Sequence, residues 1–308
     1  MRRERTRHLS IWWPFATVVI SDTRVDRCDS LANPPGNIHS VAMWIAPHPV
    51  PMSDLEMISD MRGLRVVQLL SSGADHVLPY VPNGVTVCTA PQLRAESTAE
   101  TALCLALAAA NGVVQWCEAQ RDRRWTWLPA RSGLVGRSMA IIGYGNVGQT
   151  LHRMVSGFGM AVMPVAFSSR PGVLGAEDLD AVLPAADVVA VTVPLTARTQ
   201  HLFDYSRIAL LKDGALLVNV SRGGVVDTEA LVEALWSGRI AAALDVTDPE
   251  PLPPEHPLWT CPNLLISPHV GGSSAGIGER SQRYATEQIE RYLANEPLQN
   301  VFDPSRWL

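Results

Sequence analysis

The sequence predicts an α/β protein with two parallel sheets, and three observations support this. Short apolar runs alternate with turn residues and helical stretches between residues 16 and 90, and again from residue 137 onward. An Ala/Leu-rich stretch at residues 95–114 separates the two blocks. The chain of 308 residues is long enough for two domains. Such alternation is typical of parallel strands joined by crossover helices.

The first block contains apolar runs that predict buried strands, with a helix at residues 53–61. The Ala/Leu-rich stretch predicts one buried helix, with Ser97 or Thr98 as its N-cap and Gly112 as its stop. The expected strands of this block are "ATVVI" (16–20), "SVAMWIA" (40–46), "LRVVQLLSS" (64–72) and "GVTVCTA" (84–90).

The second block predicts a doubly wound open sheet, because its apolar strands are each followed by a turn or a helix. An amphipathic helix is expected in the tail at residues 276–297. The strands expected here are those in "RSMAIIG", "AVMPVAF", "ADVVAVTVP", "GALLVNVS", "RIAAALDV" and "NLLISPHV".

Composition excludes several classes of protein. A net charge of −5 offers no basic field for nucleic acid. The five cysteines form no C-x-x-C pair, which favours free thiols over a disulfide framework or a metal site. No uninterrupted apolar stretch reaches the roughly 18 residues of a membrane span. We therefore expect a cytoplasmic protein.

The start of the chain has two interpretations. A basic segment followed by a short apolar run is typical of a signal peptide, but it also fits a basic leader before a first buried strand. Pro14 interrupts the run and no small-x-small cleavage site follows, which favours the leader.

A glycine pattern predicts a dinucleotide site. Gly143, Gly145 and Gly148 follow an apolar strand and open a helix at Asn146 and Val147. Gly143 permits a tight turn, Gly145 lets backbone approach a pyrophosphate, and Gly148 allows close packing of helix and strand. The anion then lies at the helix N-terminus, although a purely structural glycine turn is the alternative.

The segment after the next strand indicates which nucleotide is bound. A carboxylate expected about 20 residues after the glycines would bind the ribose hydroxyl of NAD. The chain instead has Ser168, Ser169 and Arg170, and no acid before Glu177. Hydroxyl donors and a guanidinium suit a phosphate, so we predict NADP(H), with NAD(H) possible. Alternatively, Arg170 is an ordinary surface charge or stacks on adenine with either nucleotide.

Three polar residues follow apolar strands at positions where open α/β sheets present functional groups. Arg222 suits a clamp for a substrate carboxylate, and His269 suits a proton donor that accompanies hydride addition. A buried Glu250 beside the imidazole would orient the ring and stabilise its positive charge. Taken singly, each has an ordinary structural explanation.

The run "VNVSRGGVVDTEALVEALWSGRIAAALDVTDPEPLPPEHPLWTCPNLLISPHVGG" resembles the signature half of the D-isomer-specific 2-hydroxyacid dehydrogenases, and the similarity extends over residues 64–301. The resemblance implies a catalytic trio of Arg222, Glu250 and His269. It implies that Ser72 and Gly73 hold the substrate carboxylate, and that Asp245 binds the nicotinamide carboxamide. The other cofactor positions it implies are Thr98, Pro194, Thr199, Val220 and Gly271.

The resemblance also implies a fold of two doubly wound domains, a Rossmann cofactor domain (residues 96–278) inserted into a flavodoxin-like substrate domain (1–95 plus 279–308). A homodimer is implied, with residues 115–134 as the expected arm, although the tryptophans of this stretch could equally belong to the core.

The expected activity is hydride transfer between NADP(H) and C2 of a small 2-oxo or 2-hydroxy acid, such as glyoxylate or hydroxypyruvate, with D-stereospecificity. One alternative is a nucleotide-sensing binding protein, since co-repressors share this fold and keep the trio. Another is a pathway-specific dehydrogenase for a different 2-hydroxy acid or for phosphite. Ser72 stands where phosphite-oxidising members have Lys, which counts against phosphite.

Overall fold

The computed structural model describes residues 10–15, 22–28, 31, 33, 36–125, 127 and 132–303. Residues 1–9 of the basic leader and the strand expected at residues 16–20 lie outside these residues. The chain divides into two compact units, which are described separately below. Among the described residues, unit 1 comprises those from 10 to 94 and from 275 to 303, and unit 2 comprises those from 95 to 274.

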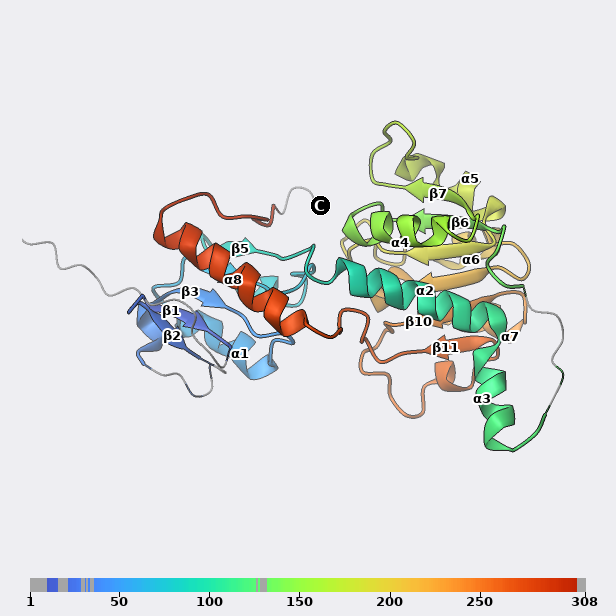
Figure 1. Ribbon diagram of the computed structural model, residues 1–308, viewed down its shortest axis with the longest axis horizontal. Helices are drawn as coiled ribbons and strands as arrows, with labels where there is room; N and C mark the ends of the chain where they lie inside the picture. Colours follow the sequence, from blue (N-terminus) through green and yellow to red (C-terminus); the bar gives the residue numbers. More distant parts are fainter. Residues whose placement is uncertain are drawn as a thin grey trace, which may run out of the picture. The chain divides into compact units, whose positions relative to one another are not determined.

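Unit 1 contains a five-stranded parallel sheet of order β2-β1-β3-β4-β5 (Figure 1). This is the strand order of flavodoxin-like folds. The strands are β1 (Ser10–Trp13), β2 (Val25–Arg27), β3 (Val41–Ile45), β4 (Val66–Gln68) and β5 (Thr86–Cys88).

Alternate residues of the unit 1 strands enter two separate cores, as the pleat of a sheet requires. Trp12 and Trp44 belong to one core, and Trp13 and Met43 belong to the other. Helix α1 (Met52–Met57) contributes Leu55 to the first core. The second core includes Ala285 and Ile289 of α8 (Ile277–Leu293), so the tail helix packs on unit 1.

Unit 2 contains a six-stranded parallel sheet of order β11-β10-β9-β8-β6-β7. The chain passes from β6 to β7 on one side and then to β8 on the other, so β6 marks the topological switch point where such sheets bind ligands. The strands are β6 (Ser138–Ile142), β7 (Ala161–Val165), β8 (Val188–Val191), β9 (Leu216–Asn219), β10 (Ala241–Leu244) and β11 (Leu264–Ile266).

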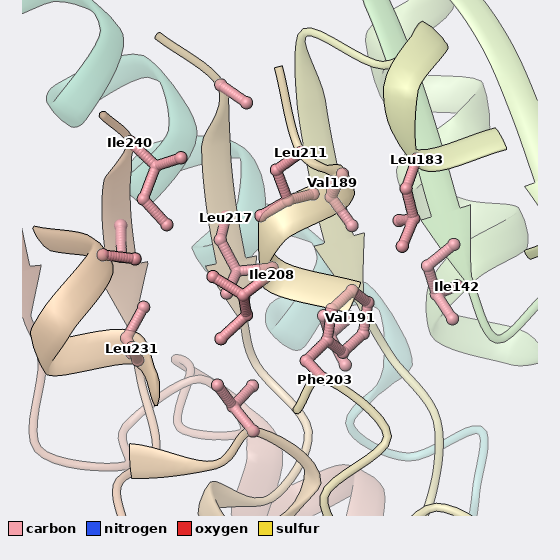
Figure 2. Close-up of a cluster of buried hydrophobic side chains, with 14 of the residues drawn as sticks. Ile142, Leu183, Val189, Val191, Phe203, Ile208, Leu211, Leu217, Leu231 and Ile240 are labelled. Atoms are coloured by element: carbon pink, nitrogen blue, oxygen red, sulfur yellow. The ribbon is translucent and has the colours of Figure 1, made fainter. Parts of the chain in front are cut away.

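Helices cover both faces of the unit 2 sheet. On one face, α2 (Ala95–Asn111) and α4 (Asn146–Ser156) share a core with Met139 and Ile141. On the other face, α5 (Leu179–Val182), α6 (Tyr205–Leu210) and α7 (Thr228–Trp236) pack against Ile142, Val189 and Leu217 (Figure 2). Two parallel-sheet α/β units confirm the predicted fold class.

The Ala/Leu-rich stretch differs from the prediction at its start. Helix α2 begins at Ala95, so Ser97 and Thr98 lie in its first turn and neither is the N-cap. Gly112 ends the helix with a φ of 72°, as expected, but α3 (Val113–Arg121) follows at once. Among the described residues no single helix is long and apolar enough to span a membrane; α2 and α3 meet that criterion only as a pair, bent by 66°.

Short 3-10 helices complete the described elements. They are Ile38–Ser40, Ile58–Asp60, Leu78–Tyr80, Ala176–Asp178, Leu183–Ala185, Gly223–Val225 and Pro257–Thr260.

Candidate functional site

The glycine turn connects β6 to α4 at the switch point of unit 2. Gly143 has a φ of 102°, and a Cβ there would lie 2.7 Å from the backbone of Thr192 and Val193. A Cβ on Gly148 would lie 2.2 Å from the Gly143 carbonyl oxygen. Both positions therefore exclude a side chain. The Thr192 hydroxyl donates to the Gly143 carbonyl over 2.6 Å and fixes the turn.

Gly145 differs from the other two glycines because a Cβ there would meet nothing within 4 Å. It is the residue immediately before α4, whose first residues are Asn146 and Val147. Open space therefore lies beside the N-terminus of an 11-residue helix. Backbone N–H groups and the helix dipole favour an anion at such a place, so this chain's residues fit a dinucleotide pyrophosphate.

The segment after β7 forms a tight turn that exposes its polar residues. The backbones of Arg170 and Val173 exchange two hydrogen bonds, and Ala166 N–H donates to the Leu174 carbonyl. Ser168, Ser169 and Arg170 are exposed. The Arg170 guanidinium donates to the Tyr144 carbonyl over 3.1 Å, which brings the end of β7 to the glycine turn.

The loop after β8 is closed by a threonine hydroxyl. Thr199 Oγ1 donates to the Pro194 carbonyl over 2.6 Å and accepts from the Thr196 N–H over 2.8 Å. Both residues follow β8, which is a neighbour of β6 in the sheet. Val220 is buried just beyond β9, while Thr98 is half-buried in the first turn of α2.

Asp245 anchors the loop that carries His269. Its side chain is buried at the end of β10 and accepts from Ser267 Oγ over 2.6 Å and from the Val270 N–H over 3.0 Å. It also accepts from the Gly271 N–H over 2.8 Å, and a Cβ on Gly271 would lie 2.7 Å from Asp245 Oδ2. Gly271 is therefore required for the approach of Asp245.

His269 and Glu250 are in direct contact although 19 residues separate them, with Nδ1 of the ring 2.5 Å from Oε1 of the carboxylate. This contact leaves Nε2 for a substrate. His269 has a φ of 51°, a conformation that non-glycine residues rarely adopt and that occurs often at functional sites. Glu250 is not buried as expected, since its loop after β10 leaves 41% of the side chain exposed.

Arg222 follows β9, and a buried asparagine positions its backbone. Asn219 is 1% exposed and donates from Nδ2 to the Arg222 carbonyl over 2.9 Å. Its Oδ1 accepts from the N–H and the hydroxyl of Ser221. Strands β9, β10 and β11 are neighbours in the sheet, so Arg222, Glu250 and His269 all follow the carboxyl ends of adjacent parallel strands.

Ser72 and Gly73 belong to unit 1, where they follow β4. The Ser71 hydroxyl donates to the Gly73 carbonyl over 2.9 Å, and the Ser72 hydroxyl donates to Pro91 over 3.4 Å. The loop is therefore fixed within its own unit.

Sequence reasoning missed three residues that shape the site, namely Thr192, Asn219 and Ser267. Each is a polar residue at the end of a strand or directly after it and is buried or half-buried, and polar side chains in such places are usually hydrogen-bonded. That signal was present in the sequence. The hydrogen-bonding partners of these three residues could not be predicted from the sequence, because each hydrogen bond depends on how strands and loops pack.

The glycine turn at a switch point and the His269–Glu250 pair at the carboxyl end of the same sheet define a class, the nicotinamide-dependent oxidoreductases of the α/β type. Comparison gives the family. The family model described as "D-isomer specific 2-hydroxyacid dehydrogenase, NAD binding domain" matches residues 103–271. The chain belongs to this family, which confirms the resemblance found in the sequence.

Individual relatives agree with this assignment. The glyoxylate reductase of Thermococcus onnurineus is 35% identical over 82% of this chain and 82% of its own length. The D-3-phosphoglycerate dehydrogenase of Methanocaldococcus jannaschii is 33% identical over 80% of this chain, which spans only 49% of that longer protein. A solved D-isomer specific 2-hydroxyacid dehydrogenase from Xanthobacter autotrophicus Py2, in complex with NADPH and MES, is 27% identical with a TM-score of 0.80, over 97% of this chain and 99% of that one.

Proposed function

We propose that this protein is an NADP(H)-dependent reductase that converts a small 2-oxo acid, such as glyoxylate or hydroxypyruvate, to the 2-hydroxy acid, with D-stereospecificity where a stereocentre forms. The observation that carries the proposal is the His269–Glu250 contact on a loop anchored by Asp245. An imidazole held by a carboxylate is suited to proton transfer. The similarity to a glyoxylate reductase supports this substrate class.

The residues of this chain have distinct proposed roles. A bound nicotinamide supplies the hydride. His269 donates a proton from Nε2 to the substrate oxygen at C2, and Glu250 holds the ring through Nδ1. Arg222 binds the substrate carboxylate and polarises the adjacent carbonyl. The backbone amides at Ser72 and Gly73 are also proposed to take part in substrate binding, as the resemblance implies.

The cofactor is proposed to lie along the carboxyl edge of β6 in unit 2, with its pyrophosphate at Gly145, Asn146 and Val147. Asp245 and Gly271 are proposed to border the nicotinamide. The remaining proposed contacts are Thr98, Gly143, Gly148, Pro194, Thr199 and Val220.

The preference for NADP(H) is proposed from the segment after β7. Ser168, Ser169 and Arg170 are exposed beside the glycine turn, and a guanidinium with two hydroxyls suits a phosphate dianion. The complex of the Xanthobacter relative with NADPH supports this preference.

We also propose that two copies associate through residues 115–134. Trp125 and Trp127 in this stretch are 92% and 89% exposed, and large exposed aromatic side chains are typical of interaction surfaces.

The test is the decay of nicotinamide absorbance with a panel of 2-oxo acids and both nucleotides, with D-3-phosphoglycerate assayed in the oxidative direction. We expect turnover of at least one 2-oxo acid and a higher kcat/KM with NADPH than with NADH. Arg170→Ala should raise the KM for NADPH about tenfold and leave NADH nearly unchanged, because one charge-assisted hydrogen bond is lost. Arg153→Ala, an exposed arginine on α4, is the matched control.

Tight nucleotide binding without turnover on any acid would contradict the enzyme proposal and favour the nucleotide-sensing alternative. Equal losses for both nucleotides in Arg170→Ala would contradict the phosphate role of Arg170.

A further inference from the structure

A cation–π pair lies beside the glycine turn of unit 2. The guanidinium carbon of Arg198 is 5.0 Å from the ring centroid of Phe167. Phe167 follows β7, and Arg198 lies in the loop after β8. Because β6 lies between β7 and β8 in the sheet, the pair bridges the carboxyl end of β6, where the glycine turn begins.

Both partners are held by hydrogen bonds of their own loops. The Arg198 N–H donates to Thr196 Oγ1 over 3.1 Å, and the Thr196 N–H in turn donates to Thr199 Oγ1. On the other side, the Ala166 N–H donates to the Leu174 carbonyl directly before Phe167. The position of the Arg198 guanidinium is therefore defined by two fixed loops and by stacking on an aromatic face.

Phe167 is 69% exposed, although burial of a phenyl side chain is worth about 1.5–3 kcal/mol. An exposed aromatic ring on the segment that carries Ser168, Ser169 and Arg170 needs a reason other than the core. The stacking of Phe167 under the Arg198 guanidinium provides such a reason, because it holds Arg198 at the segment that is proposed to bind the nucleotide phosphate.

The charges around this segment favour an external anion. In the described part of unit 2, several arginine and lysine side chains form ion pairs with carboxylates, for example Arg207 with Asp180 and Lys212 with Asp187. Arg170 and Arg198 are not among them. The Arg170 guanidinium lies against Tyr144 of the glycine turn and the Arg198 guanidinium lies over Phe167, so both place positive charge beside this segment, where it attracts an anion.

We propose that Arg198 is a specificity-determining residue that binds the adenosine 2′-phosphate together with Arg170, and that Phe167 is the positioning residue for its guanidinium. This inference rests on the proposed preference for NADP(H). It adds a contact from the loop after β8, on the opposite side of the glycine turn from Arg170.

The experiment measures binding of adenosine 2′,5′-bisphosphate and of 5′-AMP to the whole protein by isothermal titration calorimetry. These probes differ only in the 2′-phosphate. Arg198→Gln should weaken the bisphosphate by about tenfold to a hundredfold, the range of one charge-assisted hydrogen bond, and 5′-AMP by less than about threefold. Arg153→Gln, whose guanidinium donates to Thr150 on the same helix, should change neither.

Phe167→Leu tests the positioning role, since it keeps an apolar side chain and removes the aromatic face. We expect a loss of several-fold for the bisphosphate and little change for 5′-AMP. In the double variant Phe167→Leu/Arg198→Gln the losses should not add, because the ring acts through the guanidinium.

Equal weakening of both probes by Arg198→Gln would overturn the inference, since it would show contact with adenine or ribose. Unchanged binding of both probes would overturn it too. Equal binding of the two probes by the unaltered protein would instead contradict the NADP(H) preference itself. Turnover of 2-oxo acids is a separate readout, so failure of the enzyme proposal is distinguishable from each of these results.

Discussion

At the scale of single residues, the loop that carries His269 is held by contacts that few other side chains could make. Gly271 admits no Cβ because Asp245 Oδ2 would lie 2.7 Å away, and the Asp245 carboxylate accepts from three groups of the loop. The left-handed backbone of His269 is held on both sides by these bonds. A loop held in this way keeps the imidazole of His269 close to one position, so little conformational entropy is lost when the ring transfers a proton.

Replacement of His269 tests the chemistry at this scale. His269→Ala should lower kcat by about a hundredfold or more, the usual effect of a lost acid or base, while nucleotide affinity measured by fluorescence titration stays within about twofold. Glu250→Gln should lower kcat by a smaller factor, because the ring keeps a hydrogen-bonding partner without the negative charge. An unchanged kcat in His269→Ala would refute the catalytic role.

At the scale of elements, the β6–α4 unit uses its glycines for different purposes. A methyl group on Gly148 would overlap the Gly143 carbonyl oxygen, whereas a methyl group on Gly145 would enter open space. One glycine is needed for packing of the turn against the helix, and the other leaves room for a ligand.

Two alanine variants separate these roles. Gly148→Ala should lower the free energy of unfolding by about 1–3 kcal/mol, as overpacking does. Gly145→Ala should change stability by less than about 1 kcal/mol but weaken nucleotide binding at least about tenfold, because the methyl group takes space at the helix N-terminus. Urea denaturation and calorimetric titration measure the two effects. A stable Gly145→Ala that binds nucleotide normally would contradict the pyrophosphate position.

The start of β8 is joined to β6 by Asp187. Its carboxylate accepts from the N–H and hydroxyl of Ser138 and from Lys212 Nζ over 3.0 Å. Burial raises the pKa of Asp187, but the hydrogen bonds from Ser138 and the charge of Lys212 outweigh it, and the pKa falls from 3.8 to about 2. The ionised form is therefore favoured in the folded state.

This shift predicts a pH-dependent contribution to stability. A carboxyl group with a lowered folded-state pKa stabilises the fold above the unfolded pKa of 3.8, and the contribution is lost as pH falls toward about 2. Asp187→Asn should therefore cost about 1–3 kcal/mol near pH 6 and progressively less below about pH 4. Urea unfolding curves across this range measure it, and an equal difference at every pH would show that the charge does not matter.

At the scale of the whole molecule, each unit has its own sheet and its own hydrophobic cores. The glycine turn, the segment after β7 and the His269–Glu250 pair all belong to unit 2, whereas Ser72 and Gly73 belong to unit 1. Nucleotide binding is therefore expected to stabilise unit 2 directly.

Calorimetric melting tests this expectation. NADPH at about 100 times its dissociation constant should add about 2.7 kcal/mol to the stability of the unit that binds it. The transition that contains unit 2 should shift upward with NADPH, and less with NADH at the same concentration. Equal shifts with both nucleotides would contradict the preference for NADP(H).

The sequence by itself determined the local features of this protein. Apolar runs bounded by turn residues located β3 to β11, because strands and turns depend on nearby residues. The spacing of Gly143, Gly145 and Gly148 located the turn for the same reason. The end of α2 was predicted at Gly112, but its start at Ala95 was not, since the residues preferred at N-caps also occur within first turns.

Only the tertiary structure decided which distant residues meet. The order of the strands places β6 between β7 and β8, and this order brings Arg170 to Tyr144 and Arg198 to Phe167. The contact of His269 with Glu250 likewise depends on β10 and β11 being neighbours. Such contacts follow from the packing of whole elements, which local spacing does not specify.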